Sequence, residues 1–121
     1  MVSTDVVFTA YNKDRGHTYT LFEGTPDTVG MAHIVKRRPN MATRVVAIKY
    51  AVENADIAFS DKDHEDRERI YCEGADPTRP SMHMSVVVKY NTATEGTILT
   101  AWPTDKISSG GGDITYVKRK Y

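Results

Sequence analysis

Short stretches in which apolar and polar residues alternate dominate the chain, and they predict a protein rich in β-strands. The first two stretches flank a turn-forming segment and predict a hairpin. The strongest stretch, His83–Tyr90, contains three consecutive valines and predicts a central strand buried on both faces. The stretch that follows predicts its antiparallel partner. The expected strands cover residues 5–11, 17–22, 57–59, 69–72, 83–90, 97–102 and 114–117.

Between the hairpin and the later strands, a period near 3.6 residues predicts two helices. Residues 25–27 combine a hydroxyl, a proline and an acid, which is typical of a helix start, and the helix should continue to about Lys36. Pro39 interrupts it. A single apolar stripe over Met41–Asn54 predicts the second helix. The expected fold class is α+β, with N-terminal helices packed on an antiparallel β-sheet.

The length of 121 residues predicts a single domain over the whole chain, with residues 1–22 as an N-terminal hairpin extension. Cys72 is the only cysteine, so no disulfide can form within the chain. The sequence shows no apolar run long enough to span a membrane and no signal-peptide pattern at its start. We therefore expect a cytoplasmic protein, or one delivered to a target cytoplasm, without a membrane partner.

The charges are balanced in number but unevenly distributed. Sixteen basic and sixteen acidic residues give a formal net charge of zero, whereas dedicated nucleic-acid binders usually carry a positive excess. The stretch His33–Lys49 has basic residues and no acid, and acids dominate residues 53–73. Such polarity can attract an anion to one side of a neutral protein, although solvated surface charge is the simpler interpretation.

Two segments carry the candidate chemistry. Near the end of the first expected helix, His33 supplies a group that titrates near neutral pH, and Arg37 and Arg38 supply guanidinium groups suited to phosphate. The segment Gly96–Thr104 is a strand that ends in hydroxyl and indole side chains. Metal-free RNA cleavage needs a base, an acid and cations at the phosphate, and these residue types meet that need.

The strand residues complete the candidate site. Tyr71 and Thr100 are candidate hydroxyl donors to a phosphate oxygen, so the catalytic set is His33, Arg37, Arg38, Tyr71 and Thr100. Trp102 can stack on a base. The substrate-binding candidates are Trp102, Thr104 and Arg44. No metal or cofactor is expected, because the acidic stretch around residue 64 lacks the spacing of a calcium loop.

The order of elements and these motifs resemble the barnase–EndoU–colicin E5/D–RelE group of nucleases, in particular its phage- and toxin-associated members. The match consists of His33 followed by two arginines, the Pro-Asn-Met segment at 39–41, Tyr71, and Thr-Ala-Trp-Pro-Thr at 100–104. It covers residues 31–107 and leaves the first hairpin outside. The resemblance implies metal-independent RNA cleavage, with RNA and a protein inhibitor as partners, or a non-catalytic relative of such enzymes.

Each candidate residue also has a structural interpretation. His33 and the two arginines can simply stabilise a helix C-terminus, where positive charge is favourable. Tyr71 and Trp102 can belong to the core, and Thr100 can be an ordinary strand threonine. Two hypotheses therefore remain: a ribonuclease-like domain of toxin or phage type, and a catalytically inactive binding or accessory domain. Convergence of the candidate residues in one site would favour the first, and their dispersal would favour the second.

Overall fold

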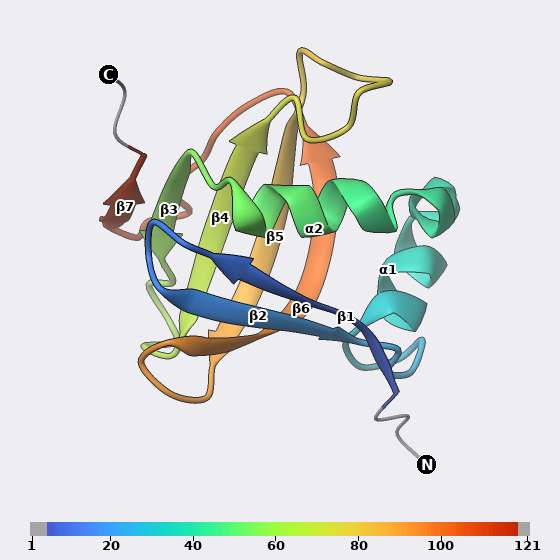
Figure 1. The fold of residues 1–121 in the computed structure, drawn as a ribbon, viewed down its shortest axis with the longest axis horizontal. Helices are drawn as coiled ribbons and strands as arrows, with labels where there is room; N and C mark the ends of the chain where they lie inside the picture. Colours follow the sequence, from blue (N-terminus) through green and yellow to red (C-terminus); the bar gives the residue numbers. More distant parts are fainter. Residues whose placement is uncertain (1–4, 119–121) are drawn as a thin grey trace.

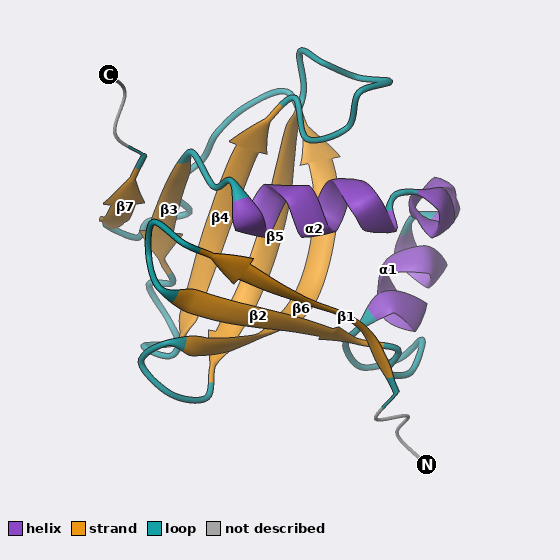
Figure 2. Cartoon of the chain, viewed as in Figure 1, coloured by secondary structure: helices purple, strands orange, loops and turns teal. Residues whose placement is uncertain are grey.

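The computed structural model describes residues 5–118, and a single seven-stranded sheet forms its framework (Figure 2). The spatial order of the strands is β1-β2-β6-β5-β4-β3-β7. Neighbouring strands are antiparallel, except that β2 and β6 are parallel. The strands are β1 (Val6–Asn12), β2 (His17–Phe22), β3 (Ile57–Ser60), β4 (Arg67–Glu73), β5 (His83–Tyr90), β6 (Glu95–Thr104) and β7 (Ile114–Val117).

Two short α-helices and one 3-10 helix connect the hairpin to the later strands. They are α1 (Met31–Arg37), η1 (Pro39–Thr43) and α2 (Val45–Glu53). The helix α2 crosses the sheet and packs against β1, β4 and β5, while α1 lies beside β6 (Figure 1). The sheet curls around α2, so that one face encloses the helix. Within residues 5–118, no helix is long and apolar enough to cross a membrane.

The expected arrangement of N-terminal helices on an antiparallel sheet is wrong. The class is still α+β, but the structure is mostly sheet, the sheet is mixed, and both α-helices are short. The first hairpin is part of this sheet, because Thr18–Thr20 pair in parallel with Glu95–Thr97. That pairing joins segments far apart in the chain, so the local alternation of side chains could not predict it.

The helix boundaries also differ from the prediction. Residues 25–28 form a turn, and α1 begins only after Gly30. Gly30 has a φ of 104°, and a Cβ there would lie 2.6 Å from the carbonyl oxygen of Phe22, so a side chain does not fit. Its N–H donates to the carbonyl of Leu99 on β6. The second helix is split, because Pro39–Thr43 form a 3-10 turn before α2 begins at Val45.

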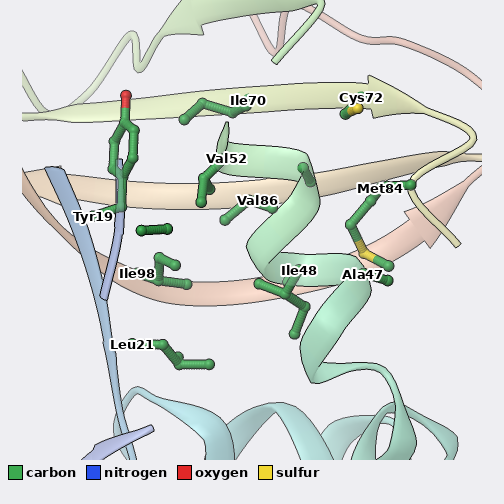
Figure 3. Close-up of a cluster of buried hydrophobic side chains, with 14 of the residues drawn as sticks. Tyr19, Leu21, Ala47, Ile48, Val52, Ile70, Cys72, Met84, Val86 and Ile98 are labelled. Carbon is green, nitrogen blue, oxygen red and sulfur yellow. The ribbon is translucent and has the colours of Figure 1, made fainter. Parts of the chain in front are cut away.

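The core lies between α2 and the concave face of the sheet (Figure 3). The strand β5 is fourth in the order of seven, which confirms the predicted central strand. Val86 and Val88 are fully buried toward α2, but Val87 is only half-buried on the other face. The prediction of full cover on both faces was therefore only partly right. The labelled core residues in Figure 3 are Tyr19, Leu21, Ala47, Ile48, Val52, Ile70, Cys72, Met84, Val86 and Ile98.

Candidate functional site

One face of the sheet carries no helix, and we call it the open face. In Figure 1 α2 lies in front of the sheet, so the open face points away from the viewer. Core side chains such as Ile70 and Val86 point toward α2, so alternate positions on these strands point the other way. The register aligns Arg69, Val87 and Thr100 in one row across three strands. The open face comprises Ile57, Phe59, Arg67, Arg69, Tyr71, Glu73, His83, Ser85, Val87, Lys89, Thr97, Thr100, Trp102, Thr104, Ile114 and Val117.

Two half-buried arginines on β4 dominate this face. Arg67 and Arg69 are two positions apart, so their side chains leave the same face about 7 Å apart along the strand. In the part of the chain that the structure describes, neither guanidinium has a hydrogen bond or an acidic partner. The guanidinium carbon of Arg69 lies 5.9 Å from the ring centre of Trp102. The face therefore offers a ligand two unpaired positive charges and an aromatic ring.

Buried polar atoms without a hydrogen-bond partner all lie on the open face. Across residues 5–118 there are three such side-chain atoms: Nε of Arg67, Nδ1 of His83 and Oγ of Ser85. Buried polar groups are nearly always paired, so an unpaired one calls for an explanation. Their concentration on β4 and β5 distinguishes this face from the rest of the described molecule.

The segment that follows β6 covers one side of the open face. The hydroxyl of Tyr71 donates to the carbonyl of Ser108 at 2.9 Å and accepts from its N–H at 3.2 Å. Both uses of this hydroxyl are structural, and the ring packs edge-on against Phe59. A cavity of about 180 Å³ is lined by Arg69, the turn after β3 and Gly110. The Arg69 guanidinium lies close to Gly110, where an added Cβ would come within 2.9 Å of it. Tyr71 thus anchors the edge of the open face, and its hydroxyl is engaged.

The other predicted strand residues are Thr100, Trp102 and Thr104. The side chains of Thr100 and Trp102 are accessible to a ligand, whereas the hydroxyl of Thr104 is already hydrogen-bonded. Both Thr100 and Trp102 are half-buried on the open face of β6. The hydroxyl of Thr104 donates to the carbonyl of Lys106 and accepts from its N–H. Thr104 therefore shapes the turn after β6.

The predicted helical residues occupy a different part of the molecule. His33 donates its Nδ1 hydrogen to the carbonyl of Pro26 at 3.1 Å, which ties α1 to the preceding turn. Arg37 and Arg38 are exposed at the end of α1. Arg44 lies 3.0 Å from the buried carboxylate of Asp76 and connects α2 to the loop after β4. Arg44 therefore has a structural partner already.

The structure does not bring the helical and strand residues into one site. The helix α1 lies beside β6, whereas Tyr71 is on β4, two strands away. Among the described residues, no hydrogen bond, ion pair or ring contact joins His33, Arg37 or Arg38 to the open face. The same part of the chain contains no cluster of three His, Cys, Asp or Glu side chains suited to a metal ion. Dispersal of the candidates favours the binding hypothesis.

A second polar cluster lies at one end of the sheet on the α2 side, and we call it the Glu68 network. Glu68 is 5% exposed and accepts two hydrogen bonds from the Arg15 guanidinium, at 2.6 and 2.9 Å. It also accepts from Tyr90 at 2.6 Å and from Thr115 at 2.7 Å. The network connects the first hairpin, β4, β5 and β7. Its members are Arg15, His17, Tyr19, Glu68, Tyr90 and Thr115.

The Glu68 network perturbs the pKa values of its members. Burial alone would raise the pKa of Glu68, but hydrogen bonds from Arg15, Thr115 and Tyr90 outweigh it and lower the pKa. Burial and the positive charge of Arg15 lower the pKa of His17. Burial and the charge of Glu68 raise the pKa of Tyr90. Because all four lone-pair positions of Glu68 are occupied by protein donors, we interpret the network as structural.

These shifts predict that acid destabilises the fold in two steps. Folded His17 and folded Glu68 both have lowered pKa values, so the unfolded chain binds more protons and acid favours unfolding. The unfolding free energy should begin to fall below about pH 6.5 as His17 titrates and fall again below about pH 4.3 as Glu68 titrates. Urea denaturation measured across this range tests the prediction. His17→Gln should flatten the first step, and an unchanged first step in that variant would contradict the assignment.

The sequence reasoning missed Arg67, Arg69, Lys89 and the Glu68 network. The signal for the two arginines was present, because the alternation Arg67-Glu68-Arg69 in a strand places both arginines on one face and the glutamate on the other. No comparable local signal exists for Arg15 and Glu68, which are 53 residues apart in the chain. Only the assembled sheet brings those two residues together.

Comparisons of the chain with protein-family models, curated proteins and solved structures found no match. The resemblance to the barnase–EndoU–colicin E5/D–RelE group therefore remains a prediction from the sequence.

Proposed function

We propose that this chain binds single-stranded RNA on the open face and acts as a binding domain rather than a nuclease. The observation that supports this most directly is the pair Arg67 and Arg69, two half-buried guanidinium groups without an acidic partner, beside the indole of Trp102. RNA supplies phosphates for the guanidinium groups and bases for the ring. Lys89 adds a further cation in the row of Arg67, although it lies 3.9 Å from Asp66.

The form of the face favours single strands. Bases in single-stranded RNA are free to stack on aromatic side chains and guanidinium planes, whereas those in a duplex are already stacked on each other. Thr100 and His83 flank Trp102 on the same face and are placed to contact a 2′-hydroxyl or a phosphate oxygen. A local positive patch of this kind attracts an anion even though the formal net charge is zero.

Metal-independent cleavage is the less supported proposal. It would use His33, Arg37 and Arg38, which lie in or just after α1, beside β6. It would also use Tyr71, whose hydroxyl is hydrogen-bonded to Ser108. We therefore place no catalytic step at these residues. A cytoplasmic location belongs to the same proposal, because it suits an RNA partner and the single buried thiol of Cys72.

The proposal predicts that removal of the aromatic surface weakens RNA binding strongly. With a labelled, unstructured RNA of about ten nucleotides at low salt, Trp102→Ala should weaken the affinity by about tenfold or more, because one stacked base is lost. Arg69→Ala should lower the slope of log affinity against log salt by about 0.7, as expected for one lost phosphate contact. Fluorescence anisotropy over a salt series measures both effects.

Arg38→Ala is the matched control, because it removes an exposed arginine just after α1 and leaves the open face intact. It should change neither affinity nor salt slope. If Arg38→Ala lowers the affinity for RNA and Arg69→Ala does not, the phosphate site lies at the end of α1 instead of on the open face.

Absence of RNA binding by the wild-type protein at low salt would overturn the proposed function. RNA incubated with the protein in EDTA should stay intact; cleavage that His33→Ala abolishes would establish the ribonuclease proposal instead.

A further inference from the structure

The sheet ends at β7, and this edge strand exposes apolar side chains. Its one partner in the strand order is β3. Ile114 is 60% exposed and Val117 is 57% exposed. An edge strand also presents backbone N–H and C=O groups that a further strand can pair with, so proteins usually protect such an edge or use it for association.

The residues of this edge are complementary to themselves in the antiparallel direction. A twofold axis between Thr115 and Tyr116 places Ile114 opposite Val117 of a second copy, and Asp113 opposite Lys118. Apolar pairs then lie within the new ladder, and opposite charges lie at both of its ends. Cross-strand pairs of both kinds stabilise antiparallel strands, whereas like charges directly opposite each other destabilise them.

The side-chain directions of β7 agree with this register. Ile114 pairs with Phe59 and Val117 pairs with Ile57 of β3. The register of β3 with β7 shifts between Ala58 and Phe59, so Ile114 and Val117 share the open-face side although they are three positions apart. Thr115 donates to Glu68, and Tyr116 lies under the Arg15 guanidinium, so both face the α2 side. Directly opposite residues in an antiparallel pair must lie on the same face. The pairs Ile114–Val117 and Thr115–Tyr116 meet this condition.

We propose that β7 is a homodimerisation edge and that its partner is the same strand of a second copy, paired antiparallel with Asp113 opposite Lys118. The strand has only four residues, so the contact is smaller than a stable interface needs, and the dimer is weak and reversible. The twofold axis is perpendicular to the sheet, so the two open faces become neighbours on the same side. Dimerisation through β7 does not depend on RNA binding, but a long RNA spanning both open faces would bind more tightly through bivalency.

Charge reversal at the two ends of the strand tests the pairing. In sedimentation equilibrium at low salt, between about 10 µM and about 1 mM, the wild-type protein should show a monomer–dimer equilibrium with a dissociation constant on the order of 0.1 mM. Lys118→Asp places an acid opposite Asp113 of the second copy, and Asp113→Lys places a cation opposite Lys118 of the second copy. Each single variant should be monomeric throughout this range.

The double variant Asp113→Lys with Lys118→Asp restores opposite charges and should restore the dimer. Thermal unfolding of each variant checks that the fold is retained, and Asp113 keeps its contacts with Ser60 because one uses its N–H and the other its carbonyl. A wild-type protein that stays monomeric at about 1 mM would overturn the proposal. So would a dimer that persists in both single variants, or a double variant that remains monomeric.

Discussion

Glu68→Gln is expected to remove about 3–5 kcal/mol of unfolding free energy, because it leaves the Arg15 guanidinium buried without its counter-charge. The Arg15 and Glu68 side chains are 8% and 6% exposed, so water cannot replace the lost partner. The substitution also weakens the bonds that Tyr90 and Thr115 donate to the carboxylate. Urea denaturation at about pH 7, above the range in which His17 and Glu68 titrate, measures the loss.

Glu65→Gln provides the control for this experiment. Glu65 is an exposed acid in the turn between β3 and β4, close to Glu68 in sequence, and its neutralisation should change the stability by less than about 0.5 kcal/mol. A loss below about 1 kcal/mol for Glu68→Gln would show that the network contributes little beyond its packing.

Ile48→Ala is expected to remove about 2–5 kcal/mol of unfolding free energy, because it leaves a cavity where α2 meets the sheet. Ile48 is fully buried and lies in the cluster that joins α2 to β4, β5 and β6 (Figure 3). Denaturant unfolding followed by circular dichroism gives the measurement. The value within this range depends on how far the neighbouring side chains can relax into the cavity.

Val46→Ala is the matched control on the same helix. Val46 is 80% exposed, so truncation removes almost no buried apolar area and should change the stability by less than about 0.5 kcal/mol. Equal losses in the two variants would mean that α2 does not pack through Ile48. Neither substitution touches the open face, so RNA binding by the folded fraction should be unchanged.

The proposed separation of stability from RNA binding rests on the two faces of the sheet. The concave face holds α2 and the core, and the Glu68 network closes one end of that side. The open face carries the unpaired arginines and Trp102. Alternation along β4 places Arg67 and Arg69 on the open face and Glu68 on the α2 side. Substitutions at neighbouring positions should therefore alter different properties of the protein.

The sequence by itself determined most of the strands. Alternating residues predicted the first hairpin and most of the later strands, because a strand exposes successive side chains to opposite faces. The run of three valines predicted the central place of β5, and the stretch after it predicted the pairing with β6. The apolar stripe predicted a helix over Met41–Asn54, although its first turn is a 3-10 helix. The start of α1 was missed, since Gly30 is required by a close approach to Phe22 that the local sequence does not reveal.

Only the tertiary structure decided which chemistry shares a site. His33 and Tyr71 looked like partners in the sequence, but α1 lies beside β6 and Tyr71 supports the segment at Ser108. Arg15 and Glu68 showed no relation until the hairpin joined the sheet through the parallel pairing of β2 with β6. The periodicity of apolar residues depends on neighbours along the chain, so it predicts individual strands and helices from the local sequence. Strand order and the meeting of distant side chains depend on long-range contacts, and these form only when the whole core is assembled.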